Sequence, residues 1–418
     1  MNKVPLNISV FVGLTILFPI IDFLNGFFLT SGISFPVGVF YRFFFFLFLI
    51  VMILAKEIPK SIFTLIVLIF ILGNAAIFLI QSIFLHNPLS WIVEDSSVFL
   101  KYFLWVLIPY YIYQRKEAFK KLNYEYLFIY ISFFFTIGLL IPYVLGVGHQ
   151  TYIHSNTGYK GYFFANNDTS FAFIISITFT ARALLLQLRK KWNAHLLFLI
   201  CLYAGNIVCL LLVGTKTAIL YGVILSMIVF VRLLFFINYQ AVTQKIFVWI
   251  ISVFIGGWVV LRGVNYAIEI IGGTYERIVY FYYLYDGDLV RLLTSSRSDF
   301  LEAGMYYFLR SSTPIFTIFF GQGFEYRLEE FGRFGLIEMD FFDALFGLGI
   351  LGILLLILIL SYFSILSIFN KKNKIYSYTF IVILLYSFFA GHVLFSALSS
   401  TFLGLVCGGI ILSKKEWG

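Results

Sequence analysis

Arginine residues gather in one polar stretch of this otherwise apolar chain, at residues 262–338. The stretch contains no lysine and seven arginines, which are Arg262, Arg277, Arg291, Arg297, Arg310, Arg327 and Arg333. A guanidinium group holds phosphate or carboxylate through paired hydrogen bonds, whereas an ammonium acts as a point charge. This composition therefore predicts a site for an anionic group. Arg291, Arg297 and Arg310 are the first candidates, because they lie around a helix predicted at 298–312 from its apolar spacing.

Three carboxylates end the same stretch, at Glu338, Asp340 and Asp343. Asp340 and Asp343 are three residues apart and share one face of a predicted helix. An acid at the edge of a bilayer costs free energy unless it has a partner, so these residues are candidates for function. We predict that Glu338 or Asp340 acts as a general base. The alternative is that the acids pair with arginines of the stretch.

Three further cations stand in or beside apolar segments. Lys216 lies at the start of an apolar segment, within Gly214-Thr215-Lys216-Thr217. It is either a residue of the functional site or a lysine whose side chain extends to the lipid headgroups. Lys101 and Arg42 lie inside apolar segments, where a charge is costly, so each is predicted to face the interior of the helix bundle. There they either pair with Asp22 or bind a lipid phosphate.

Other charged residues are predicted to be structural. Arg327 and Arg333 alternate with acids and are expected to form local ion pairs. The acids are Glu325, Glu329 and Glu330. Asp286-Gly287-Asp288 has the spacing of a metal and nucleotide-sugar site, but it is also a common turn composition. Glu94-Asp95 is likewise predicted to be a turn.

Metal and nucleotide chemistry are not indicated. The three cysteines, Cys201, Cys209 and Cys407, all fall in apolar segments and have no metal-ligand spacing. The five histidines form no pattern such as HExxH, and the chain has no Walker motif. We therefore expect no metal and no cofactor.

The elements that position these residues are predicted to be membrane helices. The chain is 61% apolar, 21% aromatic and 12% charged, and a bilayer span needs about 20 apolar residues. Twelve segments qualify, at 8–27, 35–54, 62–81, 97–113, 124–145, 168–187, 194–213, 217–236, 246–261, 339–369, 375–395 and 397–413. They are continuous, unlike the alternating segments of about 10 residues in a membrane β-barrel. The predicted fold is an all-α polytopic membrane protein.

The distribution of basic residues orients the chain. With both termini in the cytoplasm, 17 of the 29 basic residues fall on the inner side, as the positive-inside rule expects. The net charge of +9 therefore reflects topology and does not indicate nucleic-acid binding. The predicted organisation is nine helices in 1–261, an extracytoplasmic catalytic loop at 262–338 and three helices in 339–418. The expected location is the bacterial cytoplasmic (inner) membrane.

Four short stretches add a family resemblance. They are Phe164-Ala165-Asn166-Asn167, Gly214-Thr215-Lys216-Thr217-Ala218-Ile219-Leu220, Ser296-Arg297, and Gly321-Gln322-Gly323 followed by Glu338 through Gly352. In this order and spacing they resemble the O-antigen ligase and O-antigen polymerase family of bacterial membrane glycosyltransferases. The resemblance covers roughly residues 160–355, and the number and order of the predicted spans fit across the whole chain.

This resemblance implies a GT-C type helical fold and transfer of a glycan from a polyprenyl diphosphate carrier, such as an undecaprenyl-diphosphate-linked oligosaccharide. The family's diphosphate-binding residues match Arg297 and, where arginine is usual, Lys216. Arg291 and Arg310 are expected to assist. Ligases of the family usually have His-Asn where this chain has Glu338-Met339, and this departure favours a polymerase.

The expected function is therefore an inverting, metal-independent polymerase of lipid-linked repeat units of O-antigen, capsule or exopolysaccharide. Its expected partners are the carrier-linked oligosaccharide, the lipid bilayer and, as a further candidate, a chain-length regulator. The alternative within the class is a ligase that joins glycan to lipid A core. The alternative of another class is a transporter or a flippase of lipid-linked glycan.

Overall fold

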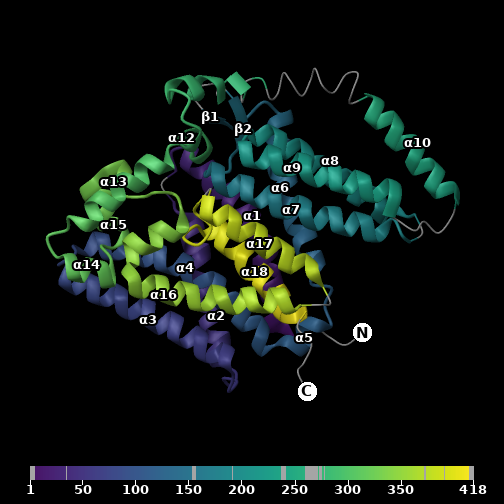
Figure 1. Cartoon of the computed structure of the whole chain (residues 1–418). Helices are drawn as coiled ribbons and strands as arrows, with labels where there is room; N and C mark the ends of the chain where they lie inside the picture. The colour runs from purple at the N-terminus through teal and green to yellow at the C-terminus, as the bar shows by residue number, and fades with distance from the viewer. Residues whose placement is uncertain are drawn as a thin grey trace. The chain divides into compact units, whose positions relative to one another are not determined.

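The computed structural model of the chain (Figure 1) describes residues 5–33, 35–152, 157–190, 192–236, 242–258, 272, 275–276, 278–370, 373–389 and 391–413. These residues divide into two compact units, which we describe separately. Unit 1 comprises Met1–Val10, Val39–Asn123 and Tyr285–Gly418, and unit 2 comprises Phe11–Gly38 and Tyr124–Leu284. Helix α1 (Leu6–Thr30) belongs to unit 1 up to Val10 and to unit 2 from Phe11.

The described residues of unit 1 form helices and the connections between them, with no strand. Its helices are α2 (Val37–Leu54), α3 (Ile62–Phe84), α4 (Leu89–Gln114), α5 (Lys116–Lys120), α12 (Leu289–Thr294), α13 (Arg297–Leu309), α14 (Pro314–Phe320), α15 (Phe324–Phe331), the 3-10 helix η4 (Gly332–Phe334), α16 (Asp340–Phe369), α17 (Lys374–Phe389) and α18 (Ala397–Ser413). Helix α18 packs mainly on α4, and α16 packs on α3, α14 and α17. The short helices α12–α15 are drawn in green in Figure 1: α13 and α14 pack on α16, α12 packs on α13, and α15 packs on α4.

Unit 2 is built around α7 (Asn166–Gln187), which packs against three neighbouring helices. These are α6 (Glu125–Val144), α8 (Ala194–Val213) and α9 (Lys216–Val231). The remaining elements are the antiparallel strands β1 (His149–Tyr152) and β2 (Thr157–Gly161), the π-helix η2 (Arg232–Phe236) and α10 (Val242–Trp258). Most residues of α7 are buried, because α7 is covered by neighbours on several sides.

A helix lies in each of the twelve apolar segments predicted from the sequence, but α17 ends at Phe389, before the predicted end at 395, and residues 391–395 are not helical. Within the described ranges, eight helices are long and apolar enough to cross a membrane, namely α1, α2, α3, α6, α7, α8, α9 with η2, and α16. The protein is therefore a mostly helical, polytopic membrane protein. Twelve spans, the GT-C fold, the orientation and the division at 261 and 338 stay predictions.

Local chemistry explains several helix ends. Ser61 caps α3, because its side chain accepts a hydrogen bond from the Thr64 N–H at 3.1 Å. Asn193 caps α8 in the same way through the Leu196 N–H, and Gly214 ends α8 in the left-handed conformation, with φ at +71°. Within the polar stretch, the helix predicted at 298–312 is α13, which ends at Leu309.

Candidate functional site

The centre of the candidate site is an ion pair between Arg297 and Glu338, two of the predicted site residues. The Arg297 Nη2 lies 2.7 Å from the Glu338 Oε2, across 41 residues of sequence. The Arg297 side chain is 12% exposed and the Glu338 side chain 43% exposed. The Arg297 Nε is buried and has no hydrogen-bond partner among the described residues. The guanidinium is thus held in place, keeps an unused donor and meets a carboxylate that solvent can reach.

An unusual turn precedes Arg297. Ser295 and Ser296 both have left-handed φ values, +55° and +64°, which are uncommon for residues other than glycine. The Ser296 Oγ donates to the Tyr285 hydroxyl at 2.5 Å, and the Ser296 N–H donates to the Arg291 carbonyl at 2.9 Å. These bonds hold the turn between α12 and α13 and place Arg297 at the first position of α13.

The backbone of Glu338 is also held in a left-handed conformation, with φ at +60°. The connection between α17 and α18 packs against it at Gly391, which itself has φ at +69°. A Cβ atom at Gly391 would lie 1.6 Å from the Glu338 carbonyl oxygen. Only a glycine therefore allows this close approach, and the approach fixes the position of Glu338.

Helix α13 is fixed to the start of α16 by a small apolar cluster. The cluster contains Phe308, Ile337, Met339 and Phe346, all nearly buried. The rings of Phe308 and Phe346 lie 5.2 Å apart. Gly304 allows the contact, because a Cβ atom there would lie 2.8 Å from the Ile337 Cδ1. The cluster therefore connects the helix of Arg297 to the segment of Glu338.

Asp340 and Asp343 are fully buried at the start of α16, in contrast to Glu338. Asp340 accepts hydrogen bonds from the Ser387 Oγ at 2.6 Å and from two backbone N–H groups. These belong to Val393 at 2.8 Å and Leu394 at 3.3 Å. The negative charge also lies at a helix N-terminus, which stabilises it. The geometry makes Asp340 a brace between α16 and the α17–α18 connection.

Asp343 braces the other side of the same turn. It accepts hydrogen bonds from the Ile337 N–H at 2.8 Å and the Met339 N–H at 3.2 Å. Both donors flank Glu338 in sequence. The two buried aspartates therefore shape the backbone on which Glu338 stands.

Helix α16 breaks at Gly349, whose φ of +69° and ψ of −171° are not helical. A break of this kind frees backbone carbonyls, which need other donors where water is excluded. The Phe346 carbonyl accepts from the Gln322 N–H at 3.0 Å, and the Gly347 carbonyl accepts from the Gly323 N–H at 3.0 Å. Gln81 of α3 also donates to Gly347, at 2.6 Å. The predicted turn at 321–323 is thus the partner of the break.

Arg327 departs from the sequence prediction of a local ion pair. Its side chain is 1% exposed, and its guanidinium lies 5.0 Å from the Phe346 ring centroid. Neither terminal nitrogen has a hydrogen-bond partner in the described part of the chain. Burial lowers the pKa of Arg327 to about 10, and the nearby Asp343 carboxylate opposes this shift. The prediction was wrong because Arg327 lies on the buried face of α15, which is directed toward α16.

The other two first candidates, Arg291 and Arg310, have partners other than Glu338. Arg291 makes a forked ion pair with Asp299, with its Nη2 2.7 Å from the Asp299 Oδ2, and this contact raises the pKa of Arg291. Both residues line a cavity of about 640 Å³ beside α13. Arg310 is exposed and donates to the Tyr306 hydroxyl at 2.7 Å. Arg262 and Arg277 lie outside the described residues.

The three isolated cations have different locations. Lys216 begins α9 in unit 2, directly after Thr215, whose hydroxyl lies 2.7 Å from the Ser170 hydroxyl. Lys101 lies in α4 and Arg42 in α2, both half-buried. Their roles toward lipid or diphosphate stay predictions.

Sequence reasoning missed several residues of the site. Asp95 was predicted to lie in a turn, but it is in α4, is 1% exposed and accepts the Glu325 N–H at 2.9 Å. His392 has a left-handed φ of +58°, a buried Nδ1 without a described hydrogen-bond partner, and electrostatic contact with Asp340 and Asp343. Gln81 and His392 both carried a signal, because each is a polar residue within a predicted apolar segment, 62–81 and 375–395.

Metal binding was not expected, and no group of three or more histidine, cysteine or acidic residues that could hold a metal occurs among the described residues. Independence from metal stays a prediction.

The fold is that of a polytopic membrane protein, and its polar site combines Arg297 and Glu338 with two buried carboxylates at the start of α16. Comparison with known families identifies the class of the protein. A family model for O-antigen ligase like membrane proteins matches residues 7–269 and 280–416, nearly the whole chain, so the protein belongs to this family. This confirms the resemblance found in the sequence. No curated protein matches the chain.

Membership places the chain among glycosyltransferase-like membrane enzymes of polysaccharide and lipopolysaccharide biosynthesis. The match does not separate ligases from polymerases. That choice depends on the residues of the site.

Proposed function

We propose that the protein is a polymerase of lipid-linked oligosaccharide repeat units. It would transfer glycan from an undecaprenyl diphosphate carrier to a hydroxyl of the acceptor repeat unit, at the outer face of the cytoplasmic membrane. The observation that carries the proposal is the 2.7 Å contact between Arg297 and Glu338. It joins a diphosphate-binding type of residue to an accessible carboxylate in a chain of this family.

In the proposed resting site, Glu338 neutralises Arg297 until the donor binds. The diphosphate then takes the guanidinium, which forms stronger, forked hydrogen bonds with phosphate oxygens. The unused Arg297 Nε supplies a second donor for this exchange. Glu338 is released and becomes able to accept a proton.

The transfer step follows from these positions. Glu338 accepts the proton of the acceptor hydroxyl, and the hydroxyl oxygen forms a bond to the anomeric carbon of the donor. The bond between that carbon and the diphosphate oxygen breaks, and its electron pair leaves with the carrier diphosphate. Arg297 stabilises the negative charge that develops there. A single displacement inverts the anomeric carbon and needs no metal in this proposal.

The remaining predicted residues take supporting roles in the proposal. Asp340 has a positioning role and is not the base in this proposal, because its buried oxygens already accept three hydrogen bonds and thereby hold the segment of Glu338. Arg291 and Arg310 assist the diphosphate only after leaving their partners Asp299 and Tyr306. Lys216 belongs to unit 2, and its role as a diphosphate ligand stays a prediction of the sequence.

A ligase that joins glycan to lipid A core is the second candidate, because the matching family model is described by ligases. The carboxylate at 338, where ligases of the resemblance have histidine, favours the polymerase. Product analysis separates the two in cells. Loss of a polymerase leaves single repeats on the acceptor, whereas loss of a ligase leaves carrier-linked polymer.

Reconstitution with synthetic lipid-linked repeat units tests the proposal. Purified protein in vesicles without any ion gradient is expected to lengthen the glycan, and Arg297→Gln and Glu338→Gln each to reduce the rate by more than about 100-fold. Arg333→Gln and Glu330→Gln are matched controls, because both residues are exposed on the same segment. Unchanged elongation in either site variant would reject the assigned roles, and glycan movement without elongation would indicate a transporter.

A further inference from the structure

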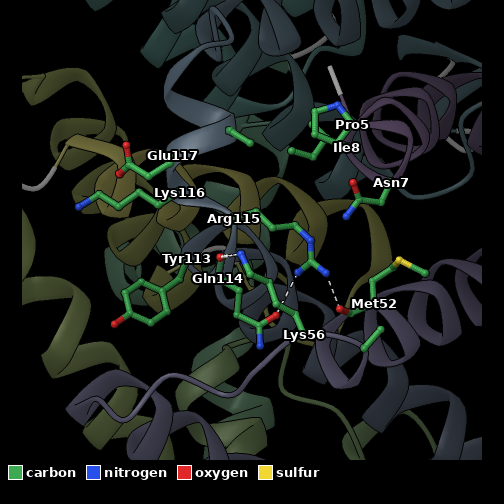
Figure 2. Close-up of a pocket in the computed structure, with 12 residues that line it drawn as sticks. Pro5, Asn7, Ile8, Met52, Lys56, Tyr113, Gln114, Arg115, Lys116 and Glu117 are labelled. Carbon is green, nitrogen blue, oxygen red and sulfur yellow. Dashed lines mark hydrogen bonds between the residues drawn. The ribbon is translucent and has the colours of Figure 1, made fainter. Parts of the chain in front are cut away.

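A second cavity of unit 1 lies at the opposite ends of its helices from those that carry the ion pair. Its volume is about 590 Å³, and it is formed by the first residues of α1, the ends of α2 and α4, and the start of α5. Figure 2 shows the Arg115 guanidinium and the Asn7 amide facing this cavity. None of its lining residues belongs to the candidate glycosyltransferase site.

Arg115 provides a buried positive charge in the cavity. Its side chain is 7% exposed, and its guanidinium donates to the Gln114 Oε1 at 3.0 Å and to the Met52 carbonyl. The Arg115 Nε is buried and has no hydrogen-bond partner in the described part of the chain. Burial lowers the pKa of Arg115, because desolvation opposes its charge.

Lys56 adds a second cation. Its Nζ donates to the Gln114 carbonyl, as drawn in Figure 2. The hydrogen-bond partners of Arg115 and Lys56 are thus neutral oxygens, and the Arg115 guanidinium also lies 4.2 Å from the Tyr111 ring centroid, so none of these contacts places a carboxylate against either cation. The one acid that lines the cavity, Glu117, pairs with Lys120 at 2.7 Å and extends away from the guanidinium. The cavity therefore has room and charge for an anion.

The start of α1 adds to the positive potential. This helix has 25 residues, and its first four N–H groups have no acceptor within the helix; two of them, those of Ile8 and Ser9, donate to the Pro5 carbonyl. A helix N-terminus also favours negative charge through the macrodipole. The cavity thus combines a helix start with two side-chain cations.

Apolar side chains form much of the remaining wall, including Pro5, Ile8 and Met52. A cavity lined by both apolar side chains and cations suits an amphipathic ligand better than a free ion. We propose that this cavity binds a phosphate group, and that its apolar walls select the phosphate of a membrane lipid. The predicted orientation places the cavity at the inner leaflet, where anionic lipids meet basic residues.

Native mass spectrometry of the purified full-length protein tests this proposal with phosphatidylglycerol and phosphatidylcholine as probes. The wild type is expected to retain phosphatidylglycerol at a concentration about tenfold lower than phosphatidylcholine, which corresponds to about 1.4 kcal/mol. Lys56→Gln should remove this preference, because it removes one of the two cations of the cavity. Lys56 is exposed, so its replacement should leave the fold intact. Lys121→Gln is the matched control, an exposed lysine at the same end of the unit.

Arg115→Gln provides the second variant. It should lose the preference for phosphatidylglycerol while it elutes as the wild type does on size exclusion, and Arg115→Lys should restore part of it. Equal retention of the two lipids by the wild type would overturn the proposal. Equal weakening in Lys56→Gln and Lys121→Gln would do so as well, because it would indicate unspecific attraction.

Inorganic phosphate separates the two sources of the ligand. Millimolar phosphate is expected to leave phosphatidylglycerol bound and the thermal unfolding midpoint unchanged. If phosphate instead displaced the lipid and raised the thermal unfolding midpoint, the cavity would be a phosphate site, but the proposal that it selects a lipid would be overturned.

Discussion

Replacement of Gly391 by alanine tests whether backbone packing controls the site. The new Cβ would lie 1.6 Å from the Glu338 carbonyl oxygen, whereas carbon and oxygen atoms normally approach to about 3.3 Å. One of the two segments must therefore move by roughly 1.7 Å. The left-handed φ of +69° adds a backbone cost of about 1–2 kcal/mol for alanine.

A displacement of about 1 Å at a reacting group is enough to cost about 100-fold in rate. Gly391→Ala is therefore expected to reduce elongation by at least about 100-fold per folded molecule. The assay is elongation of lipid-linked repeat units, normalised to the protein that remains monodisperse after purification. Thermal unfolding of the same samples gives the change in stability.

Gly146→Ala is the matched control for Gly391→Ala. Gly146 has nearly the same φ, +68°, and an added Cβ there would meet nothing within 4 Å. Its free energy of unfolding should fall by about 1–2 kcal/mol or less, because alanine is strained at this φ, and its activity should be unchanged. Equal loss of activity in the two variants, or full activity in Gly391→Ala, would refute the argument that Gly391 positions Glu338.

Further variants test individual contacts. Arg291→Gln should reduce elongation by no more than about tenfold, because its guanidinium is already paired with Asp299; steady-state rates measure this. Ser387→Ala should lower stability by about 1.5–3 kcal/mol through the lost bond to the buried Asp340 carboxylate, with elongation retained, as thermal unfolding and rate measurements would establish. Phe308→Ala should lower stability by about 3–5 kcal/mol, measured by unfolding, because the ring is nearly buried in the α13–α16 cluster.

The helices of this protein were predictable because their signal is local. Runs of apolar residues long enough to cross a bilayer identify spans without any knowledge of their neighbours. The predicted helix at 298–312 and the turn at Gly321 to Gly323 were found for the same reason, from spacing and glycine content. The family resemblance was also found from short stretches, and the family match confirms it.

Partners across the sequence were less predictable. Glu338 was selected with Arg297 as a candidate, but their ion pair depends on the left-handed turns at Ser296 and Glu338, which no local pattern indicates. The burial of Arg327 depends on which side of α15 faces α16. The bracing role of Asp340 depends on backbone donors in a connection more than 50 residues away, so its charge alone favoured catalysis.

The break in α16 at Gly349 has a consequence for engineered chimeras. The Phe346 and Gly347 carbonyls accept hydrogen bonds from the N–H groups of Gln322 and Gly323, so residues 340–348 are bonded to that turn. The rest of α16 continues beyond the break at Gly349 as a separate helical segment. A graft that ends near 338, the predicted border of the membrane span, would take the two partners of each of these bonds from different parents. Exchange of acceptor preference between relatives should therefore transplant the segment through Gly349, together with the short connection that carries Gly391.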